Sequence, residues 1–162
     1  MNADEKVKVA LVAILLVYAG LVISPILLGD RVIEPFSELG ILGPNMKLGD
    51  YPREVAVSEA FPLYLYLGNH EGALSYYMVL AKVGNRGMNV SESEPYGGLT
   101  LARYEYFLLD KTNVTTPISL SVSEPGLNRR LVFELYRYDS ERGGLVYQGN
   151  WVQLWLNVTA TR

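Results

Sequence analysis

The stretch LVFELYRYDSERGGLVYQGNWVQLWLNV, residues 131–158, decides the fold class of this chain. Apolar side chains recur at every second position in its first part and again in its last eight residues. This alternation is typical of a β-strand with one buried face, and the ERGG at residues 141–144 is a turn signal. The stretch therefore predicts consecutive antiparallel strands. We expect the inward face of the last strand to consist of Val152, Leu154, Leu156 and Val158.

The same alternation recurs along the rest of the chain from residue 33 onward. It predicts strands at residues 36–42, 53–57, 63–67, 73–83, 99–107 and 118–122. Turn signals, such as GNHEG at 68–72 and GNRG at 84–87, separate these segments. Because no stretch here has amphipathic helical spacing, the seven or eight strands predict an all-β, immunoglobulin-like antiparallel sandwich over residues 36–162.

A second kind of segment precedes the sandwich. Residues 9–28 carry no charge, and thirteen of these twenty are Leu, Ile or Val. A helix of this length spans ~30 Å, which is about the thickness of a bilayer's hydrocarbon core. Its apolar residues lie on every face, which argues against a buried core helix. We therefore predict a short N-terminal segment at 1–8, a transmembrane helix at 9–28 and a linker at 29–35.

Cleavage and orientation of this helix follow from its flanks. Val17 and Ala19 fit the small-x-small pattern of a signal peptide, but the apolar run continues well past them. We therefore expect an uncleaved anchor. Lys6 and Lys8 precede the helix, whereas Arg31 follows it among acidic residues, so the positive-inside rule places the N-terminus in the cytoplasm.

Three Asn-x-Ser/Thr sequons offer a separate indication of orientation. Asn89, Asn113 and Asn157 all lie beyond the helix, as expected if the C-terminal domain is extracytoplasmic and glycosylated. We expect Asn89 and Asn113 in loops and Asn157 on the outward phase of its strand.

The composition excludes several function classes. The net charge of -3 makes nucleic acid an improbable partner, and the absence of cysteine excludes disulfides and thiolate metal sites. His70 is the only histidine, and its GNHEG context predicts a hairpin turn, with Asn69 or Gly72 at positive φ, rather than a catalytic base. The acidic pairs around Ser93 and Ser140 lack the spacing of a calcium loop. We expect no enzyme activity, cofactor or metal.

Aromatic residues on outward phases are candidate contacts. Tyr136, Tyr138, Trp151 and Trp155 either form a protein interface or a sugar-stacking platform, or belong to the inner face of an irregular strand. Residues 84–98, rich in Gly, Ser, Glu and Asn, predict a long exposed loop, which is either a further contact site or an ordinary connection.

Several segments together resemble the archaeal membrane-protein family known as domain-of-unknown-function family 1616. They are FSELGILGP (36–44), DYPREVAVSEAFP (50–62), GNHEG (68–72), RRLVFELYRYD (129–139) and WVQLWLNV (151–158). The resemblance implies an extracytoplasmic immunoglobulin-like module, similar also to adhesion-type modules, and no known activity. Members of the family typically carry several membrane helices before this domain, whereas this sequence has one.

The leading interpretation is a structural or self-associating, non-catalytic protein of an archaeal cell envelope. The bilayer and other protein subunits, either further copies or a polytopic membrane protein, are its expected partners. Two alternatives stay open: an accessory single-pass subunit of a larger complex for glycan transfer or secretion, and a glycan-binding surface module.

Overall fold

The structure is a computed structural model that describes residues 2–28 and 34–160. It divides into two compact units, Met1–Glu34 and Pro35–Arg162, which are described separately below. Most of the predicted linker at 29–35, including Arg31, lies outside the described residues.

The first unit is helix α1, Ala3–Leu28. It begins at Ala3 rather than at Val9, and backbone and carboxylate contacts between Asn2 and Glu5 cap its first turn. The Asn2 carbonyl accepts from the Glu5 amide, and the Glu5 carboxylate accepts from the Asn2 amide at 3.0 Å. The helix is long and apolar enough to cross a membrane. No other part of the described chain builds a helix of this kind.

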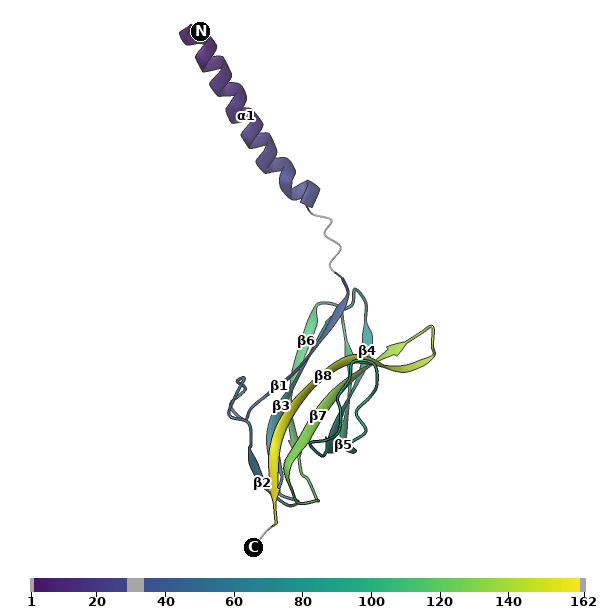
Figure 1. Ribbon diagram of the computed structural model, residues 1–162. Coiled ribbons are helices and arrows are strands. Elements are labelled where there is room, and N and C mark those ends of the chain that lie inside the picture. The colour runs from purple at the N-terminus through teal and green to yellow at the C-terminus, as the bar shows by residue number, and fades with distance from the viewer. Residues whose placement is uncertain (1, 29–33, 161–162) are drawn as a thin grey trace. The chain divides into compact units, whose positions relative to one another are not determined.

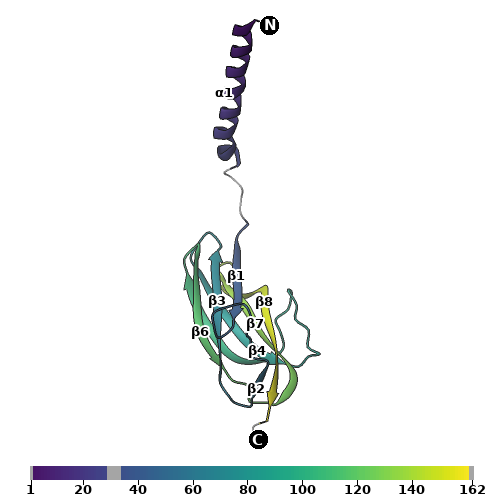
Figure 2. The ribbon, with the colours of Figure 1, turned by 90° about the vertical axis from the view of Figure 1, so that its left-hand side faces the viewer.

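The second unit is a sandwich of two β-sheets (Figures 1 and 2). Eight strands build it, in agreement with the predicted fold class. They are β1 (Phe36–Leu42), β2 (Glu54–Ala56), β3 (Phe61–His70), β4 (Ser75–Gly84), β5 (Leu99–Leu108), β6 (Thr112–Leu120), β7 (Gly126–Asp139) and β8 (Gly144–Thr159).

The strand order is that of an immunoglobulin-like fold. One sheet has the order β1-β3-β6 and the other β2-β8-β7-β4-β5. Neighbouring strands are antiparallel except for β2 and β8, which run parallel. The predicted antiparallel sandwich is confirmed, with this one parallel pair as the exception among the described strands. The three residues of β2 pair with the end of β8, with Glu54 opposite Asn157 and Ala56 opposite Thr159.

The core lies between the sheets and follows the predicted alternation. Leu63, Leu65 and Leu67 of β3 are completely buried and face residues of β7 and β8. Each buried leucine contributes about 1.5–3 kcal/mol relative to an exposed one. On β8, Leu156 and Val158 are buried, while Val152 and Leu154 pack against the same core. The predicted inward face of the last strand is therefore confirmed.

Candidate interaction face

The predicted contact residues lie on the outer face of the five-stranded sheet. Tyr136 and Tyr138 belong to β7, and Trp151 and Trp155 to β8. Tyr138 is 48% exposed and Trp155 is 39% exposed, whereas Tyr136 and Trp151 are half-buried. Tyr138 is near the β7–β8 turn, while Trp155 pairs with Arg130 near the other end of the hairpin. The four aromatics therefore do not form a single patch.

Trp155 is engaged with its cross-strand neighbour. The Arg130 guanidinium lies 4.5 Å from the centre of the Trp155 ring, and its Nη1 donates to the Met88 carbonyl at 2.9 Å. This cation–π contact covers one side of the indole. Trp155 thus helps to hold the loop that contains Met88.

That loop, residues 85–98 and here called the strap, crosses the outer face of the sheet. It covers an ion pair in which Lys82 Nζ lies 2.7 Å from Glu134 Oε2. The Glu134 side chain is completely buried. Tyr96, only 1% exposed, completes the cluster: its carbonyl accepts from Lys82 at 2.9 Å, and its amide donates to Glu134. A buried pair needs such additional hydrogen bonds to offset desolvation.

The strap corrects the prediction of a simple exposed loop. Most of its residues are exposed, but it buries Tyr96 and also shields Val132 and Glu134, which lie on the outward phase of β7. Its middle is tied to β8, because the Tyr147 hydroxyl donates to the Ser91 carbonyl at 2.8 Å. Burial, together with the negative charges of Glu134 and Glu92, raises the pKa of Tyr147 to about 12.

The strap packs against a bulge in β8. Between the pairs Glu134–Trp151 and Tyr136–Tyr147, β8 contains two more residues than β7. Gly149, within this bulge, has φ +73°, and a Cβ added there would lie 2.7 Å from the Glu92 carbonyl oxygen. Glycine therefore meets two requirements here, a left-handed backbone and a close approach of the strap.

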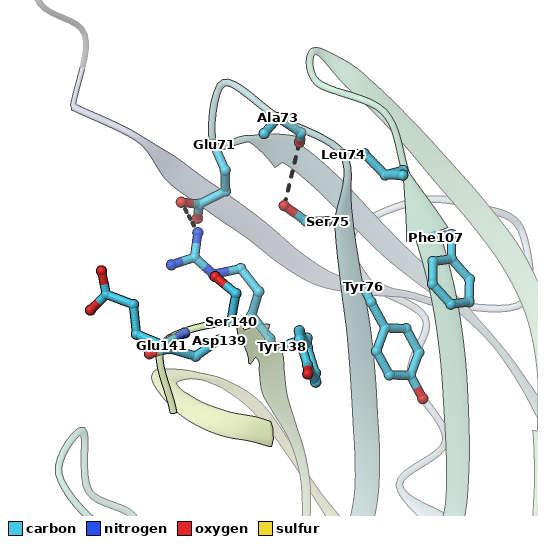
Figure 3. A pocket seen from close by; sticks show the side chains of 11 residues that line it. Glu71, Ala73, Leu74, Ser75, Tyr76, Phe107, Tyr138, Asp139, Ser140 and Glu141 are labelled. Carbon is cyan, nitrogen blue, oxygen red and sulfur yellow. Dashed lines mark hydrogen bonds and ion pairs between the residues drawn. The ribbon is translucent and has the colours of Figure 1, made fainter. Parts of the chain in front are cut away.

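Beyond the strap, a groove of about 480 Å³ opens on the same sheet, beside the β7–β8 turn (Figure 3). Its apolar side is an aromatic row of one residue each from β5, β4 and β7. The Tyr76 ring is 4.6 Å from that of Phe107 and 6.5 Å from that of Tyr138. Phe107 is 71% exposed. The sequence indicated only Tyr138, because the register between strands decides that the other two lie beside it.

The polar side of the groove is an ion pair between Glu71 and Arg137 (Figure 3). Ser37 Oγ donates to Glu71 Oε1 at 2.5 Å, which fixes the carboxylate from β1. Asp139 closes the groove at the β7–β8 turn. Amides of Arg142 and Glu141 donate to Asp139 and lower the pKa of its carboxyl group.

Asn69 organises the turn beside this groove. It is completely buried, its Nδ2 donates to the Ala73 and Leu108 carbonyls at 2.8 Å each, and its Oδ1 accepts from the Glu71 amide and the Tyr77 hydroxyl at 3.0 Å each. The prediction of a turn at 68–72 is wrong in position, because β3 continues to His70. Positive φ is confirmed for Gly72, at +80°, and not for Asn69.

His70 lies at the end of β3 and takes part in sheet packing. Its ring stacks on Phe36 with centroids 4.6 Å apart, and its Nε2 lies 3.7 Å from Glu38 Oε2. Tyr66 donates to the same Glu38 oxygen at 2.6 Å, and this hydrogen bond raises the pKa of Tyr66. The predicted turn position is wrong for His70 as well.

The three sequon asparagines differ in their surroundings. Asn89 is exposed in the strap, as predicted. Asn113 is exposed but lies in β6, paired with Gly68, so the prediction of a loop is wrong there. Asn157 is half-buried on β8, and its Oδ1 accepts from the Asn128 amide at 2.9 Å.

These features define a class: an immunoglobulin-like sandwich module that follows a helix long enough to cross a membrane. The chain belongs to the family described as Domain of unknown function (DUF1616), whose model matches residues 31–156. The family resemblance of the sequence is thereby confirmed. No curated protein matches the chain.

Several solved structures are similar to this chain at low sequence identity. The CARDB domain of the PF1109 protein from Pyrococcus furiosus, in a crystal with di-metal ions, is 12% identical with a TM-score of 0.48, covering 78% of this chain and 90% of that one. A β-glucosidase from Listeria innocua is 11% identical with a TM-score of 0.47, covering 78% and 16%. A chain of the human zinc 2-glycoprotein and prolactin inducible protein complex is 10% identical with a TM-score of 0.47, covering 80% and 99%.

Proposed function

We propose that this chain is a non-catalytic, self-associating protein of an archaeal cell envelope, anchored by α1 with its N-terminus in the cytoplasm and its sandwich outside. The observation that carries the proposal is the exposed aromatic row on a domain joined to an apolar helix. A contiguous patch of large, exposed apolar side chains marks a contact surface. Phe107 is 71% exposed and Tyr138 is 48% exposed.

The orientation rests on the lysines at the start of α1. Lys6 and Lys8 precede the apolar residues, and positive charge stays preferentially on the cytoplasmic side. The sequon at Asn89, on the exposed part of the strap, is consistent with an extracytoplasmic sandwich.

The natural absence of cysteine permits a direct test of topology. Ser119→Cys and Ala3→Cys each add one exposed thiol, on β6 and at the start of α1. In intact cells, a membrane-impermeant maleimide should label Ser119→Cys and should label Ala3→Cys only after lysis. The reverse pattern would overturn the proposed orientation. Sizing of the full chain in mild detergent tests self-association, and a strictly monomeric protein would contradict it.

The groove favours a second candidate function, sugar binding. An aromatic row stacks against the apolar face of a pyranose, while the neighbouring Asp139 and Glu141 carboxylates accept hydrogen bonds from hydroxyls. Saturation-transfer NMR with glucose, mannose and galactose would detect such binding. Phe107→Ala should abolish the signal, whereas Thr100→Ala, an exposed change elsewhere on β5, should retain it.

A further inference from the structure

The four edge strands of the sandwich differ in how well they are protected against pairing with another chain. β2 is only three residues long, and β6 contains Pro117, which has no amide to donate. β1 has seven residues with Gly40 in its middle. β5 has ten residues with neither glycine nor proline, and it pairs on one side only, with β4. Short strands, prolines, bulges and charged side chains are the usual protections. β5 is the longest edge strand and has no proline, and its one bulge lies near its start.

The side chains of β5 also suit a partner. The regular part of the strand follows a bulge at Leu101, where Ala102 pairs with Ala81 and Thr100 with Lys82. The strand carries one opposite-charge pair, with Arg103 Nε 2.5 Å from Glu105 Oε1. Both side chains are about half exposed, at 53% and 45%. The remaining side chains from Leu101 to Leu108 are uncharged.

We infer that β5 is the strand through which two copies of this chain pair, antiparallel and two-fold symmetric about Tyr104. This inference rests on the proposed self-association and names the surface that performs it. In this register Arg103 of each copy faces Glu105 of the other. On the opposite face Ala102 of each copy faces Tyr106 of the other, so charges meet opposite charges and hydrophobic side chains meet hydrophobic ones. The two five-stranded sheets become one continuous ten-stranded sheet.

Charge selects this register over its neighbours. A two-fold axis at Glu105 would place the two Glu105 carboxylates opposite each other, and an axis at Arg103 would oppose two guanidinium groups. Like charges directly opposite each other destabilise a sheet pair, whereas opposite charges stabilise it. Only an axis at Tyr104 satisfies all four charges of the regular segment.

The antiparallel pairing fixes where Phe36, the first residue of each sandwich's first strand, lies in the dimer. Phe36 pairs with His70, at the same end of the sandwich as Ser75 and Leu108. In an antiparallel pair the two Phe36 residues therefore lie at opposite ends of the joined sheet. Pairing in this register therefore joins chains anchored in two facing membranes. Detergent micelles permit the same geometry, so the test is made with the full chain in detergent.

Directed disulfides test the register. Directly opposed Cβ atoms lie about 4.5–5.5 Å apart and diagonal ones about 7–8 Å apart, and a disulfide requires about 4.4–6.8 Å between its Cα atoms. Differently tagged Arg103→Cys and Glu105→Cys chains, co-expressed and oxidised, should form a mixed disulfide in at least about tenfold excess over either chain alone. The heterodimer keeps one native Arg103–Glu105 contact. Ser119→Cys mixed with Glu105→Cys is the matched control, with equal numbers of thiols on different sheets.

Charge exchange provides a second readout without cysteines. Arg103→Glu places glutamates opposite each other twice, so the dimer dissociation constant in detergent should rise at least about tenfold. Adding Glu105→Arg restores complementarity, and the constant should return to within about twofold of wild type. Thermal melting of each variant separates this effect from any loss of folding.

The outcomes distinguish the inference from the function on which it rests. A mixed disulfide together with charge rescue establishes the β5 pair. A Glu105→Cys chain that cross-links to itself best overturns the register. If the wild-type chain is dimeric, but no β5 cross-link forms and Arg103→Glu leaves the dimer dissociation constant unchanged, the inference is overturned. Self-association itself then still stands. A protein that is monomeric throughout overturns both.

Discussion

Lys82 and Glu134 form an ion pair 2.7 Å long beneath a loop, on the face of the sheet that alternation assigns to solvent. They lie diagonally opposite each other on the adjacent strands β4 and β7, because Lys82 pairs with Val132 and Leu80 with Glu134. The strap covers them and supplies the Tyr96 backbone as the third partner. The sheet thus has a second buried cluster, on its outer face.

The buried pair should be sensitive to the loss of one partner. Glu134→Leu leaves Lys82 buried without its carboxylate, which is expected to cost about 3–5 kcal/mol of unfolding free energy. Urea unfolding of the full chain in detergent measures this. Glu54→Leu removes an exposed carboxylate from β2 and should change stability by less than about 1 kcal/mol. Equal losses of unfolding free energy in both variants would contradict a stabilising role for the buried ion pair beneath the strap.

Replacing both members of that pair should recover stability. Lys82→Met with Glu134→Leu substitutes apolar side chains of similar length, and such replacements are often neutral or stabilising. We expect the double variant to be more stable than Glu134→Leu alone. Hydrogen exchange at the Tyr96 amide should nevertheless accelerate in it, because that amide loses its acceptor.

Gly149 and Gly143 form a matched pair for testing strap contact. Both have positive φ, at +73° and +67°, but only Gly149 has a neighbour where a Cβ would be placed. Gly143→Ala should cost about 1 kcal/mol from backbone strain alone. Gly149→Ala should cost more and should loosen the strap, which hydrogen exchange of residues 85–98 would show. If both alanines behave alike, the strap does not press on the bulge.

Asn69 should contribute more to the stability of the fold than an asparagine in an ordinary turn. Asn69→Ala removes four hydrogen bonds from a buried site, leaving the Tyr77 hydroxyl and two carbonyl groups with fewer partners. We expect a loss of about 2–5 kcal/mol. Asn45→Ala, at an exposed asparagine between β1 and β2, is the control and should cost less than about 1 kcal/mol. Thermal melting compares the two variants.

Alkaline pH should destabilise the sandwich through Tyr147. Its pKa is raised from the ordinary tyrosine value of 10.0 to about 12 in the fold, so the neutral hydroxyl is the form that the fold prefers. The stability contribution is complete below pH 10 and is lost as the pH rises from there towards 12. Absorbance titration of tyrosinate should reveal a late-titrating component that Tyr147→Phe reduces. An unchanged titration curve would contradict the burial of this hydroxyl.

The sequence could predict the elements whose signal is local. The apolar run of α1 and the alternation in β3, β7 and β8 predicted their type and their inward residues, among them Leu63, Phe133 and Leu154. Boundaries were less well predicted. Capping contacts between Asn2 and Glu5 accompany a start of α1 nearer the N-terminus, and pairing of Asn69 with Ser37 and Thr112 extends β3 through a sequence typical of turns.

The sequence by itself therefore determined the class of fold, since a period of two along each strand already separates the core face from the other face. Only the tertiary structure decided what happens on that other face. Whether Val132, Glu134 and Tyr136 meet solvent depends on the strap folding back over them from more than thirty residues away in the chain. The row of Tyr76, Phe107 and Tyr138 likewise depends on strand register. Register and loop packing are set by contacts between distant segments, which no local pattern encodes.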